Sequence, residues 1–503
     1  MPITGIPPTP FRLAPHPHLY QINTWSWLER MSTAPGRIAQ LDDVPDSAWD
    51  AIAQRGFQIV WLMGVWRRSP ESRRIALEDP ANPPQWDRAL PGWTPSDVIA
   101  SPYAVAAYIP DARIGTWESI DRVRAKLHAR GMALFLDFVG NHTALDHPWV
   151  REHSEYYVQA SPQEFEANSS FYYQVQTLQG PRFIALAKDP YYPPWKDVAQ
   201  INHFHSGARA AQLRELRTIA THCDGVRCDM AMLLLNDVFE SGWRRLLGDM
   251  PQPKNEFWAE ARDAVPDLTL LAEAYWGTET KLFELGFEFA YDKMLYDAVR
   301  DGNAAGARER LWSVQRFQNR FARFMENHDE PRRAVVFPND RLLADGTFMG
   351  TLPGMRFYHQ GELEGRTIHL PITLRVAADE PVDPFASAFF QRILLLTKQE
   401  VFHTGEWTLL AANSEGDTSP DGLIVYQWRS ENSWKVIAVN PSTNVAQGRM
   451  RWPQNTFPAA RYNFHDELNE VPYVREGEEL RSIGLFVRLD PFQAHIFDVS
   501  PAK

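Results

Sequence analysis

Short apolar runs alternate with longer amphipathic segments along most of the chain, from about residue 20 to residue 400. This alternation is typical of βα units that build a parallel sheet. In one segment, 116–131, Thr116 supplies a helix N-cap and Gly131 a stop signal, as expected of a crossover helix. The apolar runs that read as strands are 19–25, 57–65, 132–139, 222–228, 268–274, 287–292, 321–327 and 355–361. Eight strands with helical crossovers predict the α/β fold known as the (β/α)8 TIM barrel.

Two long stretches interrupt this rhythm. Residues 143–204 carry aromatic and proline clusters without a long helical pattern, which predicts a small inserted B domain after the third strand. The stretch 66–102 is long for a βα loop; such loops commonly border a site, and a plain surface excursion is the alternative. After about residue 400, strands alternate with turns, as in an antiparallel β domain. The predicted units are the barrel over 1–142 and 205–399, the B domain over 143–204 and a C-terminal β-sandwich over 400–503.

Charge and cysteine content limit the partners and the compartment. Acidic residues outnumber basic ones by 63 to 51, and no Lys/Arg-dense run occurs, so neither nucleic acid nor an anionic membrane is an expected partner. Cys223 and Cys228 lie at odd spacing in one predicted strand and face opposite sides, so no mutual disulfide is expected. The proline-rich residues 1–20 lack the pattern of a signal peptide. We therefore expect a cytoplasmic protein, and its oligomeric state stays open.

Polar residues collect at the ends of four predicted strands. They are Asp137, Asn141 and His142 after the third strand, Arg227 and Asp229 at the fourth, Glu273 at the fifth, and Asn327, His328 and Asp329 at the seventh. In a barrel these ends meet at one mouth, which is where the active site lies. A single aspartate at a strand end is more often a helix N-cap than a catalyst, but capping does not explain four such ends.

Two of these carboxylates suit the cleavage of a glycosidic bond, which requires a nucleophile or stabilising group and a proton donor. Arg227 lies two residues before Asp229, hence on the same strand face, where we expect it to keep that carboxylate ionised and oriented. Glu273 lies between an apolar run and two aromatic residues, so burial is expected to raise its pKa. These environments assign Asp229 as nucleophile and Glu273 as general acid/base. Asp224 has no role in this scheme.

The stretches "DFVGNH", "DGVRCD", "LAEAYW" and "ENHDEPR" resemble, in the correct order, four motifs of glycoside hydrolase family 13, the α-amylase family. "PWKDVAQIN" is similar to a patch late in the family's inserted domain, and "SPYAVAAYIPDARIGTWESID" to its second-strand loop. The resemblance covers about residues 20–400. It implies a retaining reaction at α-linked glucosides through a covalent glucosyl-enzyme.

The resemblance also implies roles for individual residues. The nucleophile, the general acid/base and a third carboxylate that grips sugar hydroxyls match Asp229, Glu273 and Asp329, respectively. The residues that match those holding the sugar and the nucleophile, or stacking under the sugar, are His142, Arg227, His328 and Tyr103.

Five positions bear on how this chain departs from the family pattern. Met232 and Leu233 replace a Lys-His pair that contacts the leaving sugar and helps to bind calcium in many α-amylases, which argues against long-chain endo-amylase behaviour. Asn141 matches a calcium-ligand position, but one oxygen does not supply the six to eight that calcium takes, so no metal or other cofactor is predicted. Ala104 and Ala107 stand where the family often has aspartate, which predicts a trimmed sugar pocket.

Three functions are open at this point. The first is a hydrolase of short α-1,4-glucans such as maltooligosaccharides, which favours chain ends if the 66–102 stretch and the inserted domain close one side of the cleft. The second is an α-glucan transglycosidase, of 4-α-glucanotransferase or trehalose/sucrose type, in which an apolar acceptor side around Met232 and Leu233 favours a sugar over water. A catalytically silent binding protein is a remote third, because all three carboxylates are present. Trp195 and Trp276 are the favoured further sugar contacts.

Overall fold

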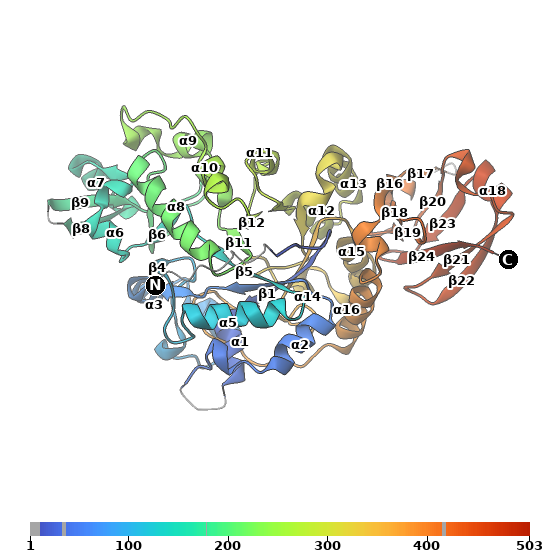
Figure 1. Cartoon of the computed structure of the whole chain (residues 1–503), viewed down its shortest axis with the longest axis horizontal. Coiled ribbons are helices and arrows are strands. Elements are labelled where there is room, and N and C mark those ends of the chain that lie inside the picture. The colour runs from blue at the N-terminus through green and yellow to red at the C-terminus, as the bar shows by residue number, and fades with distance from the viewer. Residues whose placement is uncertain (1–10, 33–36, 178, 415–418, 503) are drawn as a thin grey trace, which may run out of the picture.

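Eight parallel strands close into a barrel at the centre of the chain (Figure 1). The structure is a computed structural model that describes residues 11–32, 37–177, 179–414 and 419–502. Around the barrel the strands follow the order β1-β15-β14-β13-β12-β11-β5-β2. Their bounds are β1 (His18–Asn23), β2 (Ile59–Met63), β5 (Ala133–Phe138), β11 (Gly225–Cys228), β12 (Thr269–Ala272), β13 (Phe289–Tyr291), β14 (Phe321–Arg323) and β15 (Met355–His359). Each overlaps one of the eight predicted strands, so the barrel prediction is confirmed.

Helices connect the barrel strands and follow the last of them. The crossover predicted over 116–131 is α5, and the Thr116 side chain accepts a hydrogen bond from the backbone N–H of Ser119, as an N-cap should. The helices are α1 (Thr24–Met31), α2 (Asp46–Gln54), α5 (Trp117–His128), α8 (Ser206–Ala220), α9 (Asn236–Leu247), α10 (Phe257–Ala264), α11 (Glu279–Glu284), α12 (Lys293–Arg300), α13 (Ala304–Ser313), α14 (Arg333–Val336), α15 (Asn339–Thr351), α16 (Pro384–Thr397) and α17 (Val401–Thr404). Over the described ranges, no helix is both long and apolar enough to cross a membrane.

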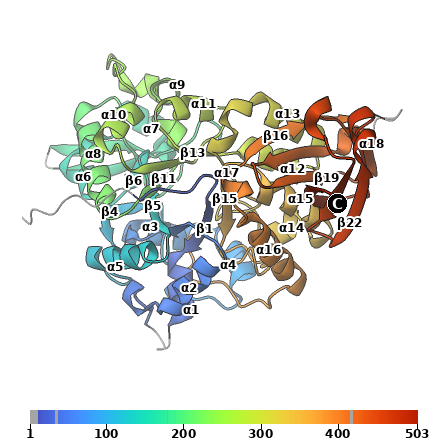
Figure 2. The same ribbon diagram turned by 45° about the vertical axis from the view of Figure 1, so that its right-hand side comes forward.

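The chain between β5 and α8 forms a separate lobe with its own apolar core. We call residues 142–204 the inserted lobe. It holds a three-stranded antiparallel sheet, a two-stranded one and two short helices. These elements are β6 (His142–Ala144), α6 (Pro148–Glu152), β7 (Gln159–Ala160), α7 (Pro162–Ala167), β8 (Tyr172–Thr177), β9 (Gly180–Ala185) and β10 (Val198–Gln200). The lobe and the C-terminal strands lie on opposite sides of the barrel in both ribbon views (Figures 1 and 2).

The stretch 66–102 contains regular structure. It begins with β3 (Trp66–Arg68), which pairs with β4 (Val105–Pro110), and continues with α3 (Pro70–Glu78) and α4 (Pro83–Ala89). Ser69 caps α3, and proline occupies the first turn of both helices, where its missing N–H is not needed.

Two antiparallel sheets form the predicted C-terminal β-sandwich. One has the order β16-β18-β19-β24-β21-β22 and the other β17-β20-β23. Alternate residues of β18 face opposite ways: Tyr426 and Trp428 hydrogen-bond to Thr351 of α15, whereas Val425 joins the core between the two sheets. The strands are β16 (Glu406–Leu410), β17 (Ala412–Asn413), β18 (Ile424–Arg429), β19 (Trp434–Val439), β20 (Ala446–Met450), β21 (Arg461–Asp466), β22 (Val471–Glu476), β23 (Leu485–Leu489) and β24 (Ala494–Pro501), with helix α18 (Gly477–Ser482). The hydrogen bonds of Tyr426 and Trp428 to Thr351 fasten the sandwich to the barrel domain.

The two cysteines are buried and carry no disulfide, as their spacing predicts. The predicted boundaries between the domains stay a proposal. Of the proline-rich segment 1–20, residues 1–10 lie outside the described residues.

Candidate active site

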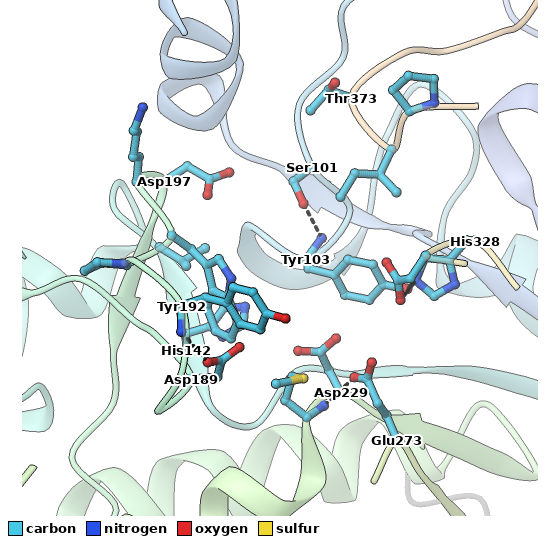
Figure 3. A pocket seen from close by; sticks show the side chains of 18 of the residues that line it. Ser101, Tyr103, His142, Asp189, Tyr192, Asp197, Asp229, Glu273, His328 and Thr373 are labelled. Carbon is cyan, nitrogen blue, oxygen red and sulfur yellow. Dashed lines mark hydrogen bonds and ion pairs between the residues drawn. The ribbon is translucent and has the colours of Figure 1, made fainter. Parts of the chain in front are cut away.

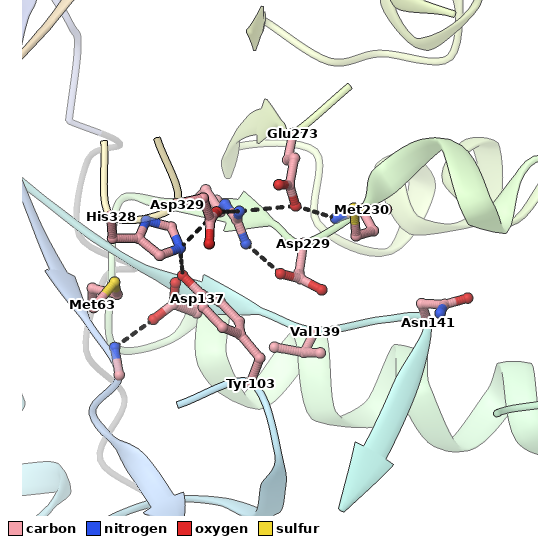
Figure 4. A network of polar contacts seen from close by, with 12 residues as sticks. Met63, Tyr103, Asp137, Val139, Asn141, Asp229, Met230, Glu273, His328 and Asp329 are labelled. Atoms are coloured by element: carbon pink, nitrogen blue, oxygen red, sulfur yellow. Dashed lines mark hydrogen bonds and ion pairs between the residues drawn. The ribbon is translucent and has the colours of Figure 1, made fainter. Parts of the chain in front are cut away.

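The buried guanidinium of Arg227 joins three carboxylates at the C-terminal mouth of the barrel. Figure 4 labels them as Asp229, Glu273 and Asp329. Because β11 pairs with β5 and β12, Arg227 lies beside Asp137 on one side and Leu271 on the other. Leu271 precedes Glu273 by two residues. Its Nη1 lies 2.5 Å from Asp229 Oδ1, and its Nη2 lies 2.8 Å from Glu273 Oε2. Asp329 Oδ2 is 3.9 Å from the same Nη2. One cation therefore holds all three predicted catalytic carboxylates.

Glu273 is restrained at both carboxyl oxygens. Met230 donates its backbone N–H to Oε2 at 2.6 Å, and Tyr275 donates its hydroxyl to Oε1 at 2.8 Å. Burial raises the pKa of Glu273 to about 7, while Arg227 opposes this rise and the charge of Asp229 adds to it. The raised pKa agrees with the sequence prediction, so Glu273 can hold a proton near neutral pH.

The other two carboxyl groups differ from Glu273 in their pKa. Burial raises the pKa of Asp229, and Arg227 only partly offsets this effect. Arg227 thus favours the ionised form of Asp229, as expected, but burial has the larger effect on its pKa. Asp329, whose side chain is 43 % exposed to the cleft, is buried enough to raise its pKa, but His328 and Arg227 together lower that pKa to about 2. Asp329 is thus ionised and Glu273 protonated at mildly acidic pH.

Tyr103 and His328 form one side of the site. The Tyr103 hydroxyl lies 2.5 Å from His328 Nε2, the two rings are stacked with centroids 5.2 Å apart, and Arg227 lies over the Tyr103 ring at 5.1 Å. His328 Nε2 also approaches Asp329 at 3.0 Å, while its Nδ1 lies 2.7 Å from the amide Nε2 of Gln21 on β1. The sequence pattern does not identify Gln21 as part of the site, because 307 residues separate it from His328.

His142 lies on the opposite side of the cavity, with Tyr103 and Asp229 between it and His328 (Figure 3). Its ring is 5.3 Å from that of Trp195, and burial lowers its pKa to about 4, so it is neutral at pH 7. Asp137 does not reach the cavity; it accepts hydrogen bonds from Trp61 and from the backbone of Gly64.

A cavity of about 950 Å³ lies over the carboxylates. Six of the seven predicted site residues line it, and the seventh, Arg227, lies beneath. Its walls come from α3 and α4, from the inserted lobe and from residues 369–373 after β15. The prediction that the 66–102 stretch borders the site is therefore confirmed.

Polar contacts beside this cavity fasten α3 and its flanking residues to the inserted lobe. Ser72 donates its hydroxyl to Asp197 at 2.6 Å, and Lys196 donates to Asp79 at 2.7 Å. Ser69, the cap of α3, donates to Asp146 of the lobe at 2.6 Å. We call these three contacts the lobe clamp.

Met232 and Leu233 do not face the cavity, so the apolar acceptor side predicted around them is wrong. Both lie in a short 3-10 helix, Ala231–Leu234, whose four side chains are buried in the barrel core. The side chain of this segment that lines the cavity beyond Asp229 is Met230. Ala104 is buried in a small apolar cluster and neither Ala104 nor Ala107 lines the cavity, so the pocket trimmed at these two positions stays a prediction.

The surroundings of Asn141 do not fit a calcium ion. The amide Nε2 of Gln200 lies 3.1 Å from the Asn141 carbonyl oxygen, 3.0 Å from Asn141 Oδ1 and 3.0 Å from the Ile201 carbonyl oxygen. A donor thus occupies the place where these oxygens converge. Within the described part of the chain, no three or more His, Cys, Asp or Glu side chains are arranged to hold a metal ion.

Four features together define the class of α-amylase-type glycoside hydrolases. They are the barrel, the lobe inserted after its third strand, the C-terminal sandwich and the carboxylates around Arg227. The family model described as "Alpha amylase, catalytic domain" matches residues 56–372. The chain therefore belongs to the α-amylase family.

Individual relatives are distant. Alpha-amylase 3 of Dictyoglomus thermophilum is 25 % identical over 277 residues, which cover 49 % of this chain and 50 % of that protein. The chain spans about half the length of the curated relatives that it matches over long stretches. Among solved structures, the noncanonic maltogenic alpha-amylase AmyB of Thermotoga neapolitana superposes with a TM-score of 0.65 at 18 % identity, covering 96 % of this chain and 98 % of that one. The alpha-amylase of Geobacillus thermoleovorans, solved with acarbose, gives 0.64 at 17 % identity over 98 % of this chain and 100 % of that one. At these identities the structural likeness shows the fold.

Proposed function

We propose that the protein is a retaining glycosidase that cleaves α-1,4-glucosidic bonds of maltooligosaccharides or related short α-glucans. The observation that carries this proposal is the bridge from Arg227 to Asp229 and Glu273, with the pKa of Glu273 raised to about 7. A shared guanidinium favours the short separation between carboxyl groups, about 5–5.5 Å, that a retaining reaction uses.

The reaction follows from these roles. In the first step an Asp229 carboxylate oxygen bonds to the anomeric carbon, Glu273 gives its proton to the leaving oxygen, and the glycosidic bond breaks. In the second step Glu273 takes a proton from water, the water oxygen bonds to the anomeric carbon, and the ester bond to Asp229 breaks. Arg227 stays charged throughout and attracts Asp229 whenever that carboxylate is ionised.

Three other residues hold the sugar in this scheme. Asp329, ionised because of His328 and Arg227, accepts hydrogen bonds from sugar hydroxyls. Tyr103 offers its ring face, and neutral His142 offers a ring nitrogen from the other side of the cavity.

Action at chain ends is supported by the lobe clamp. A long glucan needs a groove that is open at both ends, and here the contacts of α3 and its flanking residues with Asp146, Asp197 and Lys196 join two walls of the cavity. We infer that a short chain enters by its end and that polymer interiors are poor substrates.

Transglycosylation is the second candidate function, and the acceptor surface it needs differs from the one predicted from the sequence. Met232 and Leu233 are buried and cannot form an acceptor surface. Met230 and Trp276 line the cavity instead and supply an apolar surface beside Glu273. Products longer than the starting oligosaccharide would identify this activity. The remote alternative, a silent binding protein, is disfavoured because the three carboxylates are placed around one cavity.

The test is incubation of the protein with maltotriose to maltoheptaose, followed by product chromatography and NMR of the first anomer released. We expect glucose or maltose in the α-configuration. Asp229→Asn and Glu273→Gln should each lower turnover by several orders of magnitude, while Asp224→Asn, a matched change below the same strand, should leave turnover largely intact. Absence of any product at high enzyme loading, or wild-type rates in either active-site variant, would contradict the proposal.

A further inference from the structure

Apolar side chains stand exposed around the acid/base end of the cavity. Trp276 is 42 % exposed and Met294, on α12, is 51 % exposed, and both line the cavity together with Met230. Tyr191 of the inserted lobe, 69 % exposed, contacts Trp276 edge-to-face with ring centroids 5.1 Å apart. We call Met230, Trp276 and Met294 the apolar wall; Tyr191 packs against Trp276 without lining the cavity. Exposed apolar groups that cluster at a cavity mark a binding surface more often than chance.

The apolar wall adjoins the group that protonates the leaving oxygen. Met230 donates its backbone N–H to Glu273 Oε2, and Trp276 follows Glu273 by three residues on the same loop. A leaving group whose oxygen receives the Glu273 proton must lie next to that carboxyl group. The wall therefore faces the aglycone, whereas Tyr103, His328 and Asp329 face the sugar.

Two members of the apolar wall have a strained backbone conformation, which costs conformational free energy. Met230 has φ of 43° and Trp276 has φ of 62°, the left-handed region that residues with a side chain rarely adopt. Core packing does not explain the position of Trp276, since its ring is largely outside the core. Strained residues of this kind cluster at ligand-binding sites.

The polar side chains near this wall are already paired. Lys293 lies 2.5 Å from Asp297 and 3.2 Å from Glu330, and Glu279 lies 3.4 Å from Arg310. Met230, which lines the cavity directly after Asp229, is apolar, whereas the side chains of Ala231 to Leu234 are buried in the core. Recognition of further sugar hydroxyls needs unpaired donors and acceptors, which this end offers sparingly.

We propose that the apolar wall binds an apolar aglycone, so that the substrates include α-glucosides that carry an alkyl or aryl group in place of a further sugar. This inference rests on the proposed glycosidase function and names its substrate class. The same wall binds an alcohol or phenol as acceptor: its O–H proton goes to Glu273, its oxygen bonds to the anomeric carbon, and the ester bond to Asp229 breaks. Hydrolysis and transfer then compete at one site.

A series of methyl, ethyl, butyl and hexyl α-maltosides tests the inference, because these alkanols are nearly equal as leaving groups. We expect kcat/KM to rise about two- to fourfold for each added methylene up to butyl, as expected for half to full burial of a methylene. Trp276→Ala should remove most of this dependence. Trp312→Ala, a change at a tryptophan of similar exposure outside the cavity, should keep it.

The outcomes separate this inference from the proposed function. A flat alkyl series, or an unchanged series in Trp276→Ala, combined with normal hydrolysis of maltotriose, would overturn the aglycone inference alone. No turnover of maltotriose or of any maltoside would overturn both.

Discussion

The hydroxyl of Tyr275 donates a 2.8 Å hydrogen bond to Oε1 of Glu273, the carboxyl group whose pKa burial raises to about 7. A hydroxyl in this position stabilises the ionised carboxylate and so restrains the rise in pKa. Tyr275 is therefore a positioning residue for the proposed acid/base.

The pH dependence of the unmodified protein follows from the pKa values of Glu273 and Asp229. The first step needs Glu273 protonated, so kcat/KM for maltotriose should fall about tenfold per pH unit above the Glu273 pKa of about 7. The first step also needs Asp229 ionised, so kcat/KM should fall as the pH drops through the pKa of Asp229. Because burial raises that pKa, this acidic limb should lie at a higher pH than the titration of an ordinary aspartate. A profile that stays level up to pH 9 would rule out Glu273 as the proton donor.

Tyr275→Phe should move the alkaline limb of that profile upward by about one pH unit, because loss of a hydrogen bond to a charged group disfavours the carboxylate. The acidic limb should stay in place, which a general loss of structure would not produce. Tyr173→Phe, in the inserted lobe outside the cavity, is the matched control. An unchanged or lowered alkaline limb in Tyr275→Phe would remove the assigned role.

Arg227→Lys should lower kcat by about 10²- to 10³-fold, because an ammonium group is a single point that cannot bridge two carboxylates as a guanidinium does. The pair Arg124 and Asp224, joined at 2.7 Å at the opposite end of the barrel, provides the control. Arg124→Lys should lower the melting temperature and leave kcat nearly unchanged. Steady-state kinetics and thermal melts of both variants test this prediction. A near-wild-type kcat in Arg227→Lys would show that catalysis does not need the guanidinium bridge between Asp229 and Glu273.

Much of this site could be predicted from sequence because it depends on local pattern. Apolar runs separated by amphipathic segments identify the eight strands, and polar residues at strand ends identify the mouth of a barrel. The two-residue spacing from Arg227 to Asp229 is enough to place both on one face.

Other features depend on register and on distant contacts, which local pattern does not contain. The contact of Arg227 with Glu273 follows from the pairing of β11 with β12, and that of Gln21 with His328 from the closure of the barrel. Met232 was misplaced because the chain after β11 turns into a 3-10 helix, which directs its side chains into the core. Asp224, unexplained from sequence, binds Arg124, His128 and the backbone of Leu134 below the barrel.

Gln200 leads to a prediction about calcium. Its amide nitrogen already satisfies the two oxygens of Asn141 and the carbonyl oxygen of Ile201, so the unmodified protein should melt at the same temperature in EDTA and in millimolar calcium. Gln200→Glu replaces the donor with a carboxylate facing three oxygens, which leaves a buried charge unpaired and lowers the melting temperature in EDTA. Calcium, which takes oxygen ligands, should raise the melting temperature of this variant as its concentration increases. Gln200→Leu, which removes the donor without adding a charge, should be destabilised without any response to calcium. A calcium-dependent melting temperature in the unmodified protein would show that the amide does not fill this position.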